Sequence, residues 1–140
     1  MSLRIDLHVH SFFSADGVSS PEDLIASARA AGLHGFAITD HNTCDAVGYM
    51  VERGLMRADG QPVEGFLVIP GIEVTTADGH LLCLGCTLPS SLKGMPAAEV
   101  CRLAHAAGGM AVAPHPYDLF RAGIRESVLD SLPLDGLEVF

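Results

Sequence analysis

Two histidines separated by a single residue, His8 and His10, lie close to the N-terminus. On an extended strand alternate side chains face the same side, so Asp6, His8 and His10 share one face while apolar residues occupy the other. Two neutral imidazoles at this spacing can reach one metal ion. An isolated His-x-His pair is about as often a chance pair of polar residues on a solvent-facing strand. The rest of the chain must therefore decide between the two interpretations.

More polar residues fall where apolar segments end. In α/β barrels the carboxyl ends of the parallel strands converge on one face, and that face carries the active site. Packing explains such residues poorly, because an unpaired buried polar group is costly. Imidazole and carboxylate together suit zinc, manganese or iron, and a carboxylate such as Glu73 can bridge two cations. The residues in question are Asp40, His41, Glu73 and His115, with Asp16 in the first loop.

The remaining candidates have less clear positions. His80 begins its predicted strand rather than ending it, so a surface position and a site position are equally compatible with the pattern. Asp6 and Asp40 are interpreted as acids that orient neighbouring ligands rather than as ligands themselves. His34 precedes a strand and His105 lies on a predicted helix, and we assign both to structure or solvent.

The elements that must position these residues alternate between apolar strands and amphipathic helices. This alternation predicts a parallel sheet covered by helices, and hence a single α/β domain. Ser20 as N-cap with Pro21 at the first helical position marks the clearest helix start. Strands are expected at 5–10, 35–39, 66–69, 72–74, after His80, at 110–113 and at 136–140; helices are expected from 21 to about 31, at 45–56, 96–107 and 126–131.

Composition narrows the functional classes. The 140 residues carry a formal charge of −9 and no clustered basic patch, so nucleic-acid binding is not indicated. No apolar run reaches the roughly 18 residues of a membrane span, and no secretory signal is visible, so we expect a cytoplasmic protein. Bound divalent cations would restore positive charge at one spot, where a phosphate could then bind. The four cysteines are interpreted as reduced, buried residues.

The polar residues at the strand ends belong to six short motifs, which are Asp6-Leu7-His8-Val9-His10-Ser11, Ser14-Ala15-Asp16-Gly17, Thr39-Asp40-His41-Asn42, Pro70-Gly71-Ile72-Glu73-Val74, Gly79-His80-Leu81-Leu82 and Pro114-His115-Pro116. Taken in order, these motifs resemble the PHP (polymerase and histidinol phosphatase) superfamily, in particular its small stand-alone metal-dependent phosphoesterases. The resemblance implies a distorted (β/α)7 barrel, here incomplete with about four to six strands, and a site for two or three divalent metal ions.

The resemblance also implies a distribution of ligands. His8, His10 and Glu73 would hold the first metal ion. Glu73 would bridge to a second ion, which His80 and His115 complete, and this favours a site position for His80. The third ion would be held by Asp16 and His41.

The end of the chain departs from the family pattern. Family members run to about twice this length and supply a late Asp-x-His motif, which no residue after His115 provides. A complete (β/α)8 barrel needs about 250 residues. We therefore expect residues 1–140 to be the N-terminal portion of a PHP domain. The open sheet edge of such a fragment would favour a homo-oligomer.

The function implied is hydrolysis of phosphate esters, in which a hydroxide bridging two cations attacks phosphorus. The expected substrate is a phosphorylated small molecule or a nucleotide, and Arg121 is a candidate phosphate clamp, although a solvated arginine at a helix start is an alternative. A catalytically impaired PHP-like module that keeps its metals for stability is the main rival. A metal-dependent amidohydrolase is a weaker one, since such sites usually recruit a lysine and Lys93 is the only lysine.

Overall fold

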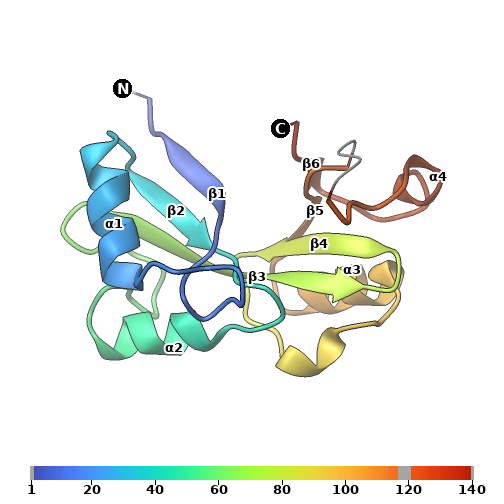
Figure 1. Cartoon of the computed structure of the whole chain (residues 1–140), viewed down its shortest axis with the longest axis horizontal. Coiled ribbons are helices and arrows are strands. Elements are labelled where there is room, and N and C mark those ends of the chain that lie inside the picture. Colours follow the sequence, from blue (N-terminus) through green and yellow to red (C-terminus); the bar gives the residue numbers. More distant parts are fainter. Residues whose placement is uncertain (1, 117–120, 140) are drawn as a thin grey trace.

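The computed structural model describes residues 2–116 and 121–139 of the chain (Figure 1). Within these ranges six strands form one sheet, in the spatial order β1-β2-β3-β4-β5-β6. The sheet curls into part of a barrel, as expected for an incomplete PHP-type barrel of four to six strands. The strands are β1 (Ile5–Val9), β2 (Gly35–Ile38), β3 (Leu67–Thr76), β4 (Gly79–Leu84), β5 (Met110–Ala113) and β6 (Gly136–Leu137).

The helices are close to their predicted positions. Ser20 caps α1, where its hydroxyl accepts the backbone N–H of Asp23 at 3.1 Å, and Pro21 is the first helical residue, as predicted. The second helix ends four residues earlier than predicted, because Gly54 adopts the left-handed conformation (φ +71°) that closes helices. The helices are α1 (Pro21–Ala30), α2 (Asp45–Glu52), α3 (Ala97–Ala106) and α4 (Glu126–Leu129), with a 3-10 turn η1 (Ser90–Leu92).

The sheet is mixed, so the prediction of a parallel sheet is wrong for β4. β1, β2 and β3 pair in parallel, as do β5 and β6, but β4 is antiparallel to both β3 and β5. The reason is the short connection between β3 and β4, which contains only Ala77 and Asp78. Two residues suffice for a hairpin, whereas a parallel crossover needs a dozen or more. The start of β4 consequently lies beside the end of β3, with His80 opposite Thr75.

The strand order leaves β1 and β6 at opposite ends of the sheet (Figure 1). Within the described ranges, each of these strands therefore has one edge with no strand neighbour. Self-association through such an edge stays a prediction. The longest helices, α1 and α3, have ten residues each, about half of what a bilayer span needs, so no helix in the described part of the chain could cross a membrane.

In the described part of the chain, two large apolar cores anchor the sheet, and a small cluster of Ala37, Leu82 and Leu84 adds to them. One lies between the parallel strands and the helices α1 and α2, and includes Phe36, Met50 and Phe66. The other packs β3, β4 and β5 against α3, and includes Leu81 and Val100. Cys83, Cys86 and Cys101 are buried free thiols, as expected, whereas Cys44 is a free thiol that is only partly buried. Because the helices hold the strands in these cores, the ends of the strands are fixed relative to one another.

Gly48 offers a test of this helical packing that leaves the strand ends untouched. It lies exposed within α2, with ordinary backbone angles and open space where a Cβ would be. Gly48→Ala should therefore raise the free energy of unfolding by about 0.5–1 kcal/mol, because alanine loses less backbone entropy on forming a helix. Urea denaturation followed by circular dichroism measures this change. An unchanged or lower unfolding free energy would contradict it.

Candidate metal centre

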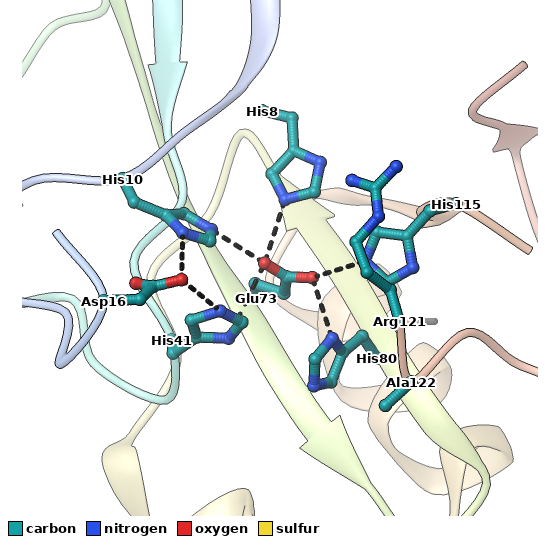
Figure 2. A pocket seen from close by; sticks show the side chains of 9 residues that line it. All are labelled: His8, His10, Asp16, His41, Glu73, His80, His115, Arg121 and Ala122. Atoms are coloured by element: carbon teal, nitrogen blue, oxygen red, sulfur yellow. Dashed lines mark hydrogen bonds and ion pairs between the residues drawn. The ribbon is translucent and has the colours of Figure 1, made fainter. Parts of the chain in front are cut away.

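Glu73 lies at the centre of a group of five histidines (Figure 2). Its carboxylate is fully buried in β3. Three imidazole nitrogens surround Oε1, at 2.9 Å (His8 Nε2), 2.7 Å (His10 Nε2) and 3.6 Å (His41 Nδ1). Two more face Oε2, at 3.3 Å (His80 Nδ1) and 3.4 Å (His115 Nε2).

Backbone hydrogen bonds between neighbouring strands hold Glu73 in this position. The N–H of Glu73 donates to the carbonyl of Asp40 at 3.0 Å, and its own carbonyl accepts the N–H of Asn42 at 2.9 Å. His41 lies between these two bonds and pairs with Glu73 as a parallel bridge. The segment that follows β2 therefore fixes the distance between the His41 and Glu73 side chains.

Asn42 secures the same junction through its side chain. Its amide donates to the hydroxyl of Thr75 at 3.0 Å and accepts the backbone N–H of Thr75 at 2.8 Å. Asn42 has φ +57°, a left-handed conformation that asparagine adopts more readily than most residues. The turn after His41 is thereby held against β3.

The loop after β1 brings Asp16 to the site. Asp16 Oδ2 lies 3.2 Å from both His10 Nδ1 and His41 Nε2, so this carboxylate joins the histidines that follow β1 and β2. A Cβ on Gly17 would lie 1.9 Å from the carbonyl oxygen of Ser11, so only glycine fits the close return of the loop.

Asp40 holds this loop in place through buried hydrogen bonds. It is 1% exposed, and it accepts hydrogen bonds from the Ser11 backbone N–H (2.5 Å), the Ser11 hydroxyl (2.7 Å) and the Ser14 hydroxyl (2.8 Å). The Ser14 hydroxyl oxygen in turn accepts the backbone N–H of His41 at 2.8 Å. Asp6 contacts the backbone N–H of His8 at 3.0 Å. The contacts found for these two acids are with backbone and hydroxyl groups, and their role in orienting ligands stays a prediction.

The charges in the site are strongly coupled. Burial would raise the pKa of Glu73, but hydrogen bonds from His10 and His8 outweigh it and hold that pKa far below its usual range. Burial would lower the pKa of His8, yet its hydrogen bonds and charge interactions with Glu73 and Glu138 raise it to about 9. Burial lowers the pKa of His115, which favours its neutral form. The site thus keeps an ionised carboxylate among imidazoles.

Three buried atoms of the site lack a hydrogen-bond partner among the described residues, namely Glu73 Oε2, His80 Nδ1 and His115 Nδ1. Such atoms are costly to bury, and a cation accepts lone pairs of this kind. Three sets of side chains have ligand atoms within 4.8 Å of one another, and each combines imidazole with carboxylate. The residues therefore fit divalent cations. The sets are His8, His10 and Glu73; His10, Asp16 and His41; and His41, Glu73 and His80.

All seven residues predicted as ligands from the sequence line one pocket of about 580 Å³. Arg121 and Ala122 line it as well (Figure 2). The two histidines assigned to structure or solvent lie elsewhere: His34 Nδ1 accepts the backbone N–H of Arg4 at 3.0 Å, and His105 lies 2.7 Å from Asp135. The seven predicted ligands are His8, His10, Asp16, His41, Glu73, His80 and His115.

Sequence reasoning missed Glu138. Its Oε2 lies 2.6 Å from His8 Nδ1, on the side of the ring that faces away from Glu73. The signal was present, because Glu138 follows β6 as Asp40 follows β2, at the end of a short apolar strand.

Comparison with known proteins places this site in a family. The family model described as "PHP domain" matches residues 6–121. An uncharacterized protein of Methanocaldococcus jannaschii is 30% identical over 149 residues, which cover 99% of this chain and 81% of that protein. A protein of Enterobacter sp. named "probable phosphatase" is 38% identical over 90 residues, covering 61% of this chain and 36% of that protein.

The fold has solved counterparts. One is a two-domain protein of Bacteroides vulgatus containing a predicted PHP-like metal-dependent phosphoesterase, with a TM-score of 0.70 at 22% identity over 98% of this chain. The chain covers 44% of that protein, and about a third of the length of the Enterobacter relative. The family match begins within β1 and runs past β5, and it includes all seven predicted ligands that line the pocket. The chain therefore belongs to the PHP domain family.

Proposed function

We propose that this chain hydrolyses phosphate esters with the help of two or three divalent metal ions. The observation that carries the proposal is the buried Glu73 carboxylate, which has imidazole nitrogens near both oxygens, while Oε2 has no hydrogen-bond partner among the described residues. Buried polar atoms without a hydrogen-bond partner are uncommon in protein cores, and buried charges are paired or coordinate metals. The names of the phosphatase and phosphoesterase relatives support the same chemistry.

The three groups of ligand atoms support a division of the site. His8, His10 and Glu73 would hold one cation. His80 and His115, which both face Oε2 of Glu73, would hold a second one together with Glu73. Asp16 and His41 would hold a third, to which His10 is also close. Zinc, manganese and iron all accept this mixture of nitrogen and oxygen ligands.

Metal ions bound here would supply Lewis-acid polarisation of a phosphoryl oxygen and lower the pKa of water. The protein side chains would hold the cations and orient the substrate. Glu73 stays ionised although it is buried, because its pKa is low, so a cation can bind its carboxylate without displacing a proton from it. Arg121, on the pocket wall, would pair with phosphate oxygens and orient the ester. The pocket is large enough for a phosphorylated small molecule or a nucleotide.

Turnover of 4-nitrophenyl phosphate and of nucleotides, by protein supplied with zinc, manganese or iron, tests the proposal. Activity should disappear with a chelator and return when metal is added back. His8→Ala should lower kcat/KM by about 10³-fold, because it removes a proposed ligand. His105→Ala, which removes a histidine outside the pocket, should leave activity unchanged.

Turnover that survives both the chelator and His8→Ala would refute the proposed function. Metal uptake without turnover of any phosphate ester would instead favour a PHP-like module that keeps metals for stability. Elemental analysis of the same protein samples separates these two results.

A further inference from the structure

Glu138 forms a contact between two parts of the site that are not neighbours in the sheet. Its Oε2 lies 2.6 Å from His8 Nδ1, and its Oε1 accepts the backbone N–H of His115 at 3.1 Å. Its own backbone N–H donates to the carbonyl of Ala113 at 2.9 Å, which holds it at the end of β5. β1 and β6 are at opposite ends of the sheet, so this carboxylate links the site across the open side of the half-barrel (Figure 1).

The contact with Glu138 determines which ring nitrogen of His8 keeps its proton. His8 Nε2 lies 2.9 Å from Glu73 Oε1, inside the pocket, while Nδ1 faces Glu138 outside it. A carboxylate on Nδ1 keeps a proton there, so Nε2 is the ring nitrogen that can give up its proton to Glu73 and offer its lone pair to a cation in the pocket. Among the described residues, Glu138 is the only carboxylate in contact with this second nitrogen.

The other carboxylate oxygen of Glu138, Oε1, accepts a hydrogen bond from the backbone of His115. This residue is 5% exposed and has φ +33°, a left-handed conformation unusual for histidine. Its N–H donates to Glu138, and its carbonyl lies so close to Gly123 that a Cβ there would come within 2.5 Å of the oxygen. The strained turn thus lies between Glu138 and the backbone of Gly123. These two neighbours keep the ring of His115 directed at Glu73 Oε2.

We propose that Glu138 is a positioning residue for metal binding: one carboxylate fixes the tautomer of His8 and the backbone turn of His115. This inference rests on the proposed function, because it assumes that both imidazoles bind cations. His8 and His115 are assigned to different cations there, so Glu138 would couple the two halves of the metal site.

The carboxylate cannot be replaced by an amide of the same size. The two donors reach different oxygens of Glu138, and a glutamine side chain has one oxygen and one NH2 group. In Glu138→Gln the amide oxygen can therefore serve only one of these donors. Either the NH2 group faces the His115 N–H, or it donates to His8 Nδ1 and the ring proton moves to Nε2, the nitrogen that would bind the cation. The matched control is Glu126→Gln, which removes the same charge from an exposed position of the nearby helix α4.

Two measurements test the inference. The first is the affinity for Zn²⁺, Mn²⁺ and Co²⁺ by competition with a chromogenic chelator, which should fall about 10–100-fold in Glu138→Gln and stay unchanged in Glu126→Gln. The second is hydrogen exchange of the His115 backbone amide in metal-free protein, which should accelerate roughly tenfold or more in Glu138→Ala, where both carboxylate oxygens are lost. Neither measurement requires catalytic turnover.

Metal affinity equal to that of wild type in Glu138→Gln would overturn the inference, whether or not the amide exchanges faster. Unchanged exchange of the His115 amide in Glu138→Ala would overturn it as well, since the contact would then not hold the turn. Wild-type protein that takes up none of these metals would refute the proposed function, and the amide exchange would still decide whether the carboxylate contact exists.

Discussion

Glu73→Gln should abolish metal loading at the shared position and lower kcat/KM for phosphate esters by about 10³-fold or more. Both oxygens of Glu73 face imidazoles, and an amide offers a single neutral oxygen in their place. The bridge between two cations would be lost, together with the negative charge that holds them. Metal content by elemental analysis and steady-state kinetics measure the two effects.

The same substitution should leave the metal-free fold intact. The amide oxygen can still accept from His8 and His10, and its NH2 group can donate to His80 or His115, which lie 3.3 and 3.4 Å from Oε2. The unfolding free energy without metal should therefore stay within about 1 kcal/mol of wild type. Metal at 1,000 times its Kd should stabilise wild type by about 4 kcal/mol and the variant far less.

Glu52→Gln, an exposed acid at the end of α2, is the matched control for charge. It should bind metal and turn over substrate like wild type. A Glu73→Gln protein that keeps its metal content would show that the carboxylate does not hold the cations.

Asp40→Ala should lower the unfolding free energy by about 3 kcal/mol. It leaves the Ser11 N–H and the hydroxyls of Ser11 and Ser14 without their acceptor, and both serines are buried. Each orphaned donor costs roughly 1–3 kcal/mol, less whatever water recovers. For a domain of this size the thermal midpoint should fall by roughly 10 °C. The loop carrying Asp16 should also loosen, so the third cation should be the first to be lost.

Asp40→Asn keeps the size and the hydrogen-bonding capacity of the side chain and removes only its charge. The amide oxygen can accept the two donors that reach Oδ1, and the NH2 group can donate to the Ser11 hydroxyl, which otherwise donates to Oδ2. This variant should lose no more than about 1 kcal/mol. Thermal unfolding and metal stoichiometry of both variants decide the matter, and equal stabilities for the alanine and asparagine variants would contradict the prediction.

The sequence by itself determined the helix start at Ser20, the α/β class, and which residues follow the strands. His10 directly follows β1, and Asp40 and His41 come two and three residues after the end of β2, so a general rule about the carboxyl ends of parallel strands was enough to group them. These features are local: strand alternation, capping and turn chemistry are written in neighbouring residues, so they can be read without knowing the fold.

Only the tertiary structure decided the positions of His80 and Glu138 and the contacts of Asp40. His80 begins its strand, yet it reaches the site because β4 runs antiparallel to β3. Glu138 contacts His8 from 130 positions away. Asp40 accepts hydrogen bonds from the hydroxyls of Ser11 and Ser14 in the loop after β1. Strand direction and long-range contacts depend on how distant segments pair, and residue periodicity does not encode that pairing.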